Sequence, residues 1–161
     1  MRITFANHLR VASFHLMGTA LMLIILWYLS FEPTMVGIFT CFWVLYTLPV
    51  LYLHIQYTHR NAGEEIIVNA NELIVRKNNE EYRYSSNELS KITVYRSASL
   101  DKGGIQFTGL ESYYFARIIT NSGVEVIITC LMGPKIHEEV RKLSGVPYER
   151  KRGLCTLGRK F

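Results

Sequence analysis

The amino-acid sequence predicts a membrane α-helical hairpin followed by a small α+β domain, an antiparallel bent sheet or barrel closed by one C-terminal helix. Three observations predict this fold class. Two long apolar runs near the start are separated only by "FEPT", residues 31–34. From residue 64 onward, short runs alternate between apolar and polar residues, as strands do. Near the end, apolar residues recur with the spacing of one helix face.

The two apolar runs, residues 11–31 and 35–55, contain no Asp, Glu, Lys or Arg. The helices of a soluble hairpin keep a polar stripe toward water, and neither run has one. A helix of this length reaches about 30 Å, the thickness of the hydrocarbon core of a bilayer. A cleaved signal peptide is disfavoured, because the first run is longer than an ordinary signal core and a second run follows at once. We therefore predict a transmembrane hairpin over residues 11–57.

Basic residues flank the hairpin on one side only. Arg2 and Arg10 precede the first run, Arg60 follows the second, and the turn carries only Glu32. Because basic residues favour the cytoplasmic side of a membrane, both termini are expected in the cytoplasm. Residues 1–10 then form a cytoplasmic N-terminus.

Strands are predicted wherever short β-rich runs are bounded by turn residues. The turns are "NAN", "KNN" and Asn121-Ser122-Gly123. The third turn is typical of a hairpin, because it is a three-residue connection that contains glycine. The predicted strands lie at 65–68, 72–76, 81–85, 91–97, 113–120 and 124–130, with a short extra strand at 105–107.

One amphipathic helix is predicted to close the domain. Pro134 suits a first helical position, and Ile136, Val140 and Leu143 recur on one face. Gly145 stands where a glycine commonly ends a helix. The domain is therefore expected to occupy residues 60–148, with a tail over 149–161.

The tail is strongly basic, in a chain whose net charge is +5. Basic residues near an anionic membrane surface contribute about 1 kcal/mol each. The tail is therefore either a lipid-facing segment or a disordered, solubilising end. Its basic residues are Arg150, Lys151, Arg152, Arg159 and Lys160.

No pattern of catalytic or metal-binding residues is found. The three cysteines are isolated, with no CxxC and no Cys/His pair at zinc spacing. Hydrolase, zinc-protease and P-loop motifs are absent from the sequence. We therefore predict a non-enzymatic protein with no cofactor and no metal. No RNP-like motif accompanies the aromatic residues, so nucleic acid is not an expected partner.

Two histidines, His15 and His54, lie within the apolar runs at similar expected depth. Ionisable groups inside a membrane are candidates for function. Either the two rings share a hydrogen bond, a proton or a metal ion, or each neutral ring bonds its surroundings separately. Two ligands alone do not complete a metal site.

The residues Tyr113, Phe115 and Arg117 share one face of a predicted strand. Tyrosine and arginine exposed together are typical anchors of protein interfaces. These three residues are therefore the predicted partner-binding residues. The alternative is that the aromatic rings fill the core of a small barrel.

The order of a two-helix hairpin, short strands and one final helix resembles the bacterial membrane-anchored PH-like proteins. The stretch "ELIVRKNNEEYRYSSNELSKITVYRS" is similar to their core, in which a strand pair leads to a polar S-x-x-E-L/I bend and a strand beginning with Ile. The tryptophan often found before the I-x-x-V strand is missing. The resemblance implies a PH-like domain at the bacterial inner (cytoplasmic) membrane.

Two functions are compatible with this architecture. The first is a module that binds a protein partner, for example a membrane-acting toxin neutralised by an immunity protein. The alternative is a PH-like module that binds anionic lipid or organises the membrane. Membrane lipid is an expected partner in both cases, and self-association into a homo-oligomer stays open.

Overall fold

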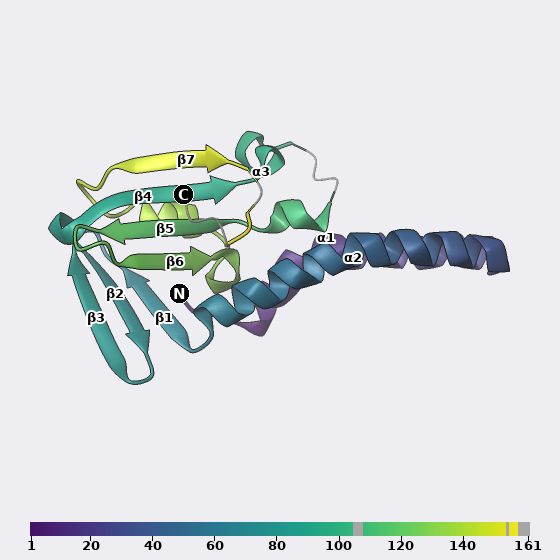
Figure 1. The fold of residues 1–161 in the computed structure, drawn as a ribbon, viewed down its shortest axis with the longest axis horizontal. Coiled ribbons are helices and arrows are strands. Elements are labelled where there is room, and N and C mark those ends of the chain that lie inside the picture. The colour runs from purple at the N-terminus through teal and green to yellow at the C-terminus, as the bar shows by residue number, and fades with distance from the viewer. Residues whose placement is uncertain (105–107, 154, 158–161) are drawn as a thin grey trace.

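The computed structural model describes residues 1–104, 108–153 and 155–157. It begins with two long helices, α1 (Phe5–Tyr28) and α2 (Pro33–Asn61). Figure 1 shows them lying side by side and extending well beyond the rest of the molecule. The predicted helical hairpin is therefore confirmed as a pair of helices. Helix α1 starts at Phe5 rather than near residue 11, so most of the expected N-terminal segment is helical.

The turn between the helices is set by local chemistry. The carboxylate of Glu32 accepts a hydrogen bond of 2.8 Å from the backbone N–H of Met35. This side-chain cap satisfies one of the free donors at the start of α2. Pro33 occupies the first turn, where its missing N–H costs nothing.

Both helices are long and apolar enough to cross a membrane. Only 11 % of the most apolar stretch of each helix is buried in the molecule. The hairpin is therefore not the enclosed core helix pair of a soluble domain.

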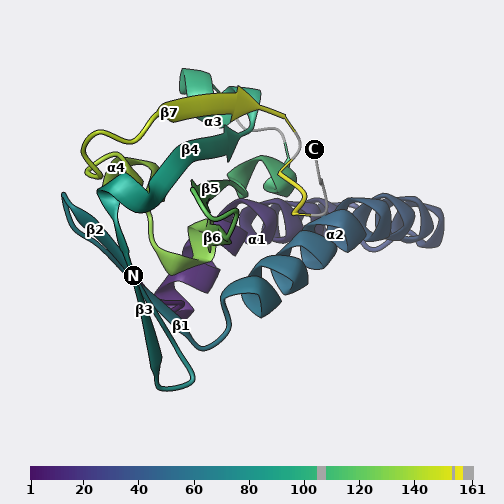
Figure 2. The same cartoon turned by 60° about the vertical axis from the view of Figure 1, so that its left-hand side comes forward.

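In the described part of the chain, seven strands follow the hairpin and form two sheets. Sheet A has the order β1-β2-β3 and sheet B the order β6-β5-β4-β7. Figure 2 shows the two sheets turned at a steep angle to one another. The strands are β1 (Glu64–Val68), β2 (Glu72–Lys77), β3 (Glu80–Ser85), β4 (Leu89–Arg96), β5 (Phe115–Thr120), β6 (Glu125–Thr129) and β7 (Tyr148–Arg152).

The first six strands lie close to their predicted positions. The predicted turn chemistry is also observed, since Asn78 and Asn79 between β2 and β3 have φ of 50° and 67°. Gly123 between β5 and β6 has φ of 84°, a conformation that glycine adopts without a steric cost. The extra strand expected at 105–107 lies outside the described residues.

Three expectations about the end of the domain are corrected. The described strands form two separate sheets, so no barrel is closed. The closing helix is short, because α4 covers only Ile136–Val140 and a turn follows it. Its predicted apolar face is nevertheless correct, since Ile136, Val140 and Leu143 are all buried. Residues 149–152 are not a tail, because they lie in β7, which pairs in parallel with β4.

Short helical turns complete the domain. They are η1 (Ser86–Glu88), α3 (Ala98–Lys102), η2 (Gly109–Ser112) and η3 (Cys130–Met132). Ser97 caps the start of helix α3, and its hydroxyl accepts a hydrogen bond from the backbone N–H of Leu100.

The base of the hairpin and the domain share one core. Val11, Val50, Leu53 and Tyr57 from the helices belong to the same buried cluster as the strands. The chain start is also paired with β1, because the backbone N–H of Ile66 donates to the carbonyl of Met1 at 2.8 Å. The N-terminus and the domain therefore lie at the same end of the hairpin.

Candidate functional site

The three predicted partner-binding residues lie inside the molecule. Tyr113 is fully buried and Phe115 is 5 % exposed. Phe115 stacks on Tyr95, with ring centroids 4.6 Å apart. The guanidinium of Arg117 forms an ion pair of 3.2 Å with Glu125. The prediction of an exposed anchor is wrong for the two aromatic residues, which fill the core beneath α2.

The two predicted histidines do not contact one another. The Nε2 of His15 lies 3.4 Å from the hydroxyl of Thr47, and its ring stacks on Tyr46. The Nε2 of His54 instead lies 2.8 Å from the Nδ1 of His8. The other ring nitrogen of His54 lies 2.8 Å from the hydroxyl of Tyr113.

Sequence reasoning missed His8, and a signal for it existed. His8 precedes His15 by two helical turns, so both lie on the face of α1 turned toward α2. Three pairs across the hairpin, 8 with 54, 15 with 47 and 19 with 43, keep a single register. The register of the two helices therefore decides which histidines pair. The expected depth of each histidine in the membrane does not by itself give this register.

Polar contacts fasten the base of α1 to the domain. One guanidinium nitrogen of Arg10 donates to the carbonyl of Cys130 at 2.6 Å and to that of Gly133 at 3.0 Å. Both carbonyls lie at the 3₁₀ turn η3, which follows β6. Such charge-assisted hydrogen bonds are stronger than neutral ones, so α1 is held at a fixed position on sheet B.

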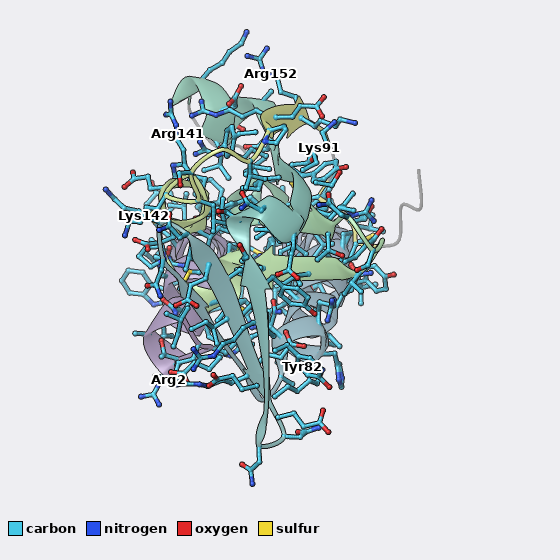
Figure 3. All side chains as sticks on the ribbon, turned by 90° about the vertical axis from the view of Figure 1, so that its left-hand side faces the viewer. Arg2, Tyr82, Lys91, Arg141, Lys142 and Arg152 are labelled. Atoms are coloured by element: carbon cyan, nitrogen blue, oxygen red, sulfur yellow. The ribbon has the colours of Figure 1, made fainter. Side chains whose placement is uncertain are left out.

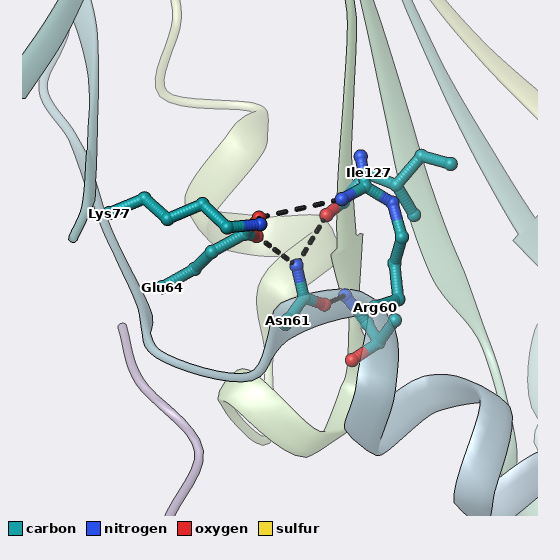
Figure 4. A network of polar contacts seen from close by, with 6 residues as sticks. Arg60, Asn61, Glu64, Lys77 and Ile127 are labelled. Carbon is teal, nitrogen blue, oxygen red and sulfur yellow. Dashed lines mark hydrogen bonds and ion pairs between the residues drawn. The ribbon is translucent and has the colours of Figure 1, made fainter. Parts of the chain in front are cut away.

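The last residue of α2 completes the open edge of β6. The side-chain amide of Asn61 donates to the carbonyl of Ile127 at 2.8 Å and accepts from the N–H of Thr129 at 3.0 Å. Asn61 also donates to Glu64, which in turn pairs with Lys77 at 2.8 Å. Figure 4 shows this network at the point where α2 meets β1 and β6. An edge strand that pairs with a side chain in this way is closed to other strands.

Two more contacts join α2 to the opposite end of the domain. The hydroxyl of Tyr57 donates to the carbonyl of Cys155 at 2.6 Å. The N–H of Gly109 in η2 donates to the hydroxyl of Tyr46 at 2.8 Å. The domain is therefore attached along a considerable length of the hairpin, and not by a single linker.

The basic residues predicted to face lipid divide into two groups. Arg150, Lys151 and Arg152 lie on β7 with partly exposed side chains. Arg152 donates to Asp101 of α3 at 2.6 Å, which holds the pKa of that carboxyl below its usual value. Arg159 and Lys160 lie outside the described residues.

A largely apolar groove of about 610 Å³ separates α2 from this end of the domain. Pro49, Tyr52 and Leu53 form its helical wall, and Leu110 and Cys155 contribute from the domain. Arg152 also lines the groove. Burial raises the pKa of the Cys155 thiol to about 12, so this sulfur is a poor nucleophile. Among the described residues, no group of three or more His, Cys, Asp and Glu side chains is placed to hold a metal ion.

Strand β3 forms the outer edge of sheet A. It pairs with β2 on one side, and nearly all its side chains are exposed. Tyr82 is 48 % exposed. Figure 3 shows Arg152 near the top of the view and Tyr82 in its lower half, on different parts of the domain. Among the described residues, the other edge of β3 has no strand partner, and this free edge is distant from the groove.

These features define a class of protein, a small two-sheet domain assembled around the base of an apolar helical hairpin. A family model described as a PH domain matches residues 2–136, and the chain belongs to this family. The matched region includes both helices and strands β1 to β6, so the hairpin lies within the family match. PH domains bind proteins or lipids. No curated protein and no solved structure matches the chain.

Proposed function

We propose that this protein is a non-enzymatic PH module anchored by its hairpin in the bacterial inner membrane, where it binds a protein partner in the cytoplasm. The observation that carries the anchoring is the exposure of apolar side chains around the free part of the hairpin. Trp27, for example, is 73 % exposed, and its neighbours Ile24 and Tyr28 are also exposed. Contiguous apolar surface of this kind marks a membrane or protein contact. The basic residues beside the helix ends favour a cytoplasmic domain.

The observation that favours a protein partner is the free edge of β3. An extended segment of another protein can add to such an edge, with main-chain hydrogen bonds supplying affinity. Tyr82 and Arg83 then supply side-chain anchors of the types that dominate protein interfaces. A membrane-acting toxin neutralised by this chain is one partner of this kind.

Anionic lipid is the second candidate ligand. Arg150, Lys151 and Arg152 on β7 favour it, since they are exposed on one strand. Two of these arginines already face Asp101, however, which reduces the charge available to a headgroup. Because the hairpin supplies the anchor, we assign recognition to the β3 edge.

Two measurements test the anchoring. The chain has two tryptophans, Trp27 and Trp43, and both lie in the hairpin. Their fluorescence should be quenched when the full-length protein is reconstituted in vesicles with brominated lipids. In intact cells, an impermeant thiol reagent should label a cysteine at Thr34 from outside and leave one at Asn121 unlabelled. Unquenched tryptophans would contradict the anchoring, and labelling at Asn121 would contradict the cytoplasmic position of the domain.

Partner binding is tested by affinity capture of the intact protein from membranes. Tyr82→Ala or Arg83→Ala should weaken capture of a specific partner by about 2 kcal/mol, roughly 30-fold. Arg141→Ala, which removes an exposed arginine on another surface, is the matched control. Equal capture by all three variants would show that β3 is not the binding edge.

A further inference from the structure

The free part of the hairpin is too short to cross a bilayer by itself. The domain already touches both helices at η2, where a Cβ on Gly109 would lie 3.2 Å from His15 and 3.2 Å from Val50. Beyond that contact, α1 continues only from residue 16 to residue 28, a length of about 20 Å. The hydrocarbon core of a bilayer is about 30 Å thick. The remaining part of the hydrocarbon core, about 10 Å, must therefore surround the part of the hairpin that packs against the domain.

Apolar exposure continues along the same stretch of α2. Leu48, Leu51, Tyr52 and Ile55 are all exposed, with Tyr52 at 61 %. These residues alternate along α2 with Val50 and Leu53, which are buried against the domain. One side of α2 thus packs on the domain while the other still presents apolar surface. This second observation agrees with the length of the free hairpin. Both observations indicate that the hydrocarbon core of the bilayer extends along α2 as far as the domain.

One end of the domain faces the same way as the tip of the hairpin. Figure 1 shows α3 and the C-terminal ends of β4 and β7 at this end. Ala98 and Lys102 of α3 are exposed, and Leu100 and Leu110 are partly buried. Arg152 lies at the end of β7. Apolar and basic side chains mixed in this way suit the boundary between headgroups and acyl chains.

The geometry points to a membrane-contact face at the α3–η2 end of the PH domain, which lies at the boundary between the headgroups and the acyl chains of an anionic phospholipid bilayer. This inference rests on the proposed anchoring and adds which face of the domain meets the lipid. Lys102 meets the phosphates, while Arg152 stays paired with Asp101 beside it. The groove beside Tyr52 and Leu53 receives part of an acyl chain. Local thinning of the bilayer also relieves a length mismatch, but it changes the depth of this face and not its identity.

The test is a comparison of probe depth in the full-length protein. A Cys41→Ala background removes the exposed thiol, while Cys130 and Cys155 stay, because both are buried. Burial raises the pKa of each of these two thiols to about 12, so they label slowly. A fluorescent probe is then placed at Ala98→Cys or Lys102→Cys. Val124→Cys, exposed at the opposite end of sheet B, is the matched control.

The labelled proteins are reconstituted in phosphatidylcholine–phosphatidylglycerol vesicles that carry quenchers on the upper acyl chain. Probes at 98 and 102 should lose roughly half their fluorescence, as expected for groups in the outer 5–10 Å of the lipid boundary. The probe at 124 should lose none. The fluorescence of Trp27 and Trp43 is measured in the same vesicles, separately from that of the attached probe. Its quenching reports whether the hairpin is inserted.

Quenched tryptophans together with α3 probes that behave like the probe at 124 would overturn the contact face and leave the anchoring intact. A second copy of the chain at this face would give a different result. The probes at 98 and 102 would then be shielded from a soluble quencher only at high protein density, and quenchers on the lipid would not affect them. That result would also overturn the inference. Unquenched tryptophans would refute the anchoring and the contact face together.

Discussion

Asn61, the last residue of α2, binds the edge of β6 as a neighbouring strand would, accepting from the N–H of Thr129 at 3.0 Å. Its amide nitrogen donates to the carbonyl of Ile127 at 2.8 Å. One side chain thus satisfies two buried backbone groups and links the hairpin to sheet B. This contact helps to fix the position of the helices on the domain, because buried polar groups without partners are costly.

Asn61→Ala should destabilise the protein strongly. The change leaves the backbone groups of Ile127 and Thr129 without their partner, at about 1–3 kcal/mol for each unsatisfied group. The free energy of unfolding in detergent micelles is the measurement. Asn87→Ala, at an exposed position in η1, is the control and should change stability little. Equal stability of the two variants would show that the Asn61 contacts add nothing.

Tyr57→Phe should free the segment after β7. The hydroxyl of Tyr57 donates to the carbonyl of Cys155, and removing it costs about 1 kcal/mol. The ring remains, so the core keeps its packing. The Cys155 thiol should then react faster with a labelling reagent, because its burial depends on this segment. Tyr82→Phe, which alters an exposed hydroxyl, should leave the labelling rate unchanged.

The domain should not be fully stable without its hairpin. The shared core includes Val11, Val50, Leu53 and Tyr57, so residues 62–161 alone would expose the surface that these side chains cover. This fragment should bind an apolar dye such as ANS and melt with low cooperativity, in contrast to the full chain. A fragment that melts sharply and binds no dye would contradict the shared core.

Leu143→Asp should unfold the domain, because Leu143 is buried below the turn that follows α4. A charge at this position costs several kcal/mol. Lys142→Asp, on the exposed neighbour, is the control for the charge change. Loss of the cooperative transition only in the Leu143 variant is the expected result in thermal melts.

Acid should loosen the contact between α3 and β7. The hydrogen bond from Arg152 lowers the pKa of Asp101, so the unfolded chain takes up this proton first as the pH falls. The stabilisation from Asp101 is therefore complete above the ordinary carboxyl pKa of about 3.9 and is lost as the pH falls through the lower folded-state value. Asp101→Asn should have a shallower fall in melting temperature between neutral pH and pH values below about 4.

The matched control for the acid experiment is Glu138→Gln, which removes an exposed carboxyl on α4. An exposed ion pair contributes little to stability, so this variant should follow the wild-type pH profile. If Asp101→Asn also follows it, the pairing with Arg152 does not stabilise the folded state.

The sequence by itself determined the elements whose formation depends on near neighbours. Two charge-free runs and the turn at Glu32 specify the hairpin. A helix at the surface of a soluble protein needs a polar face toward water, and neither run has one. Asn78, Asn79 and Gly123 specify tight turns, since these residue types accept positive φ. A PH-like domain was also accessible from the order of these elements, and the PH-domain match over residues 2–136 confirms that part of the expectation.

Only the tertiary structure decided which faces are covered. Strand alternation places Tyr113 and Phe115 on a common face, but their burial follows from α2 lying over that face. The segment "YERKR" has no apolar alternation, and it becomes β7 because β4 offers it an edge for parallel pairing. His8 pairs with His54 because of the register between α1 and α2, although the two residues are far apart in sequence. Each of these outcomes depends on long-range packing, which a local pattern of side chains does not determine.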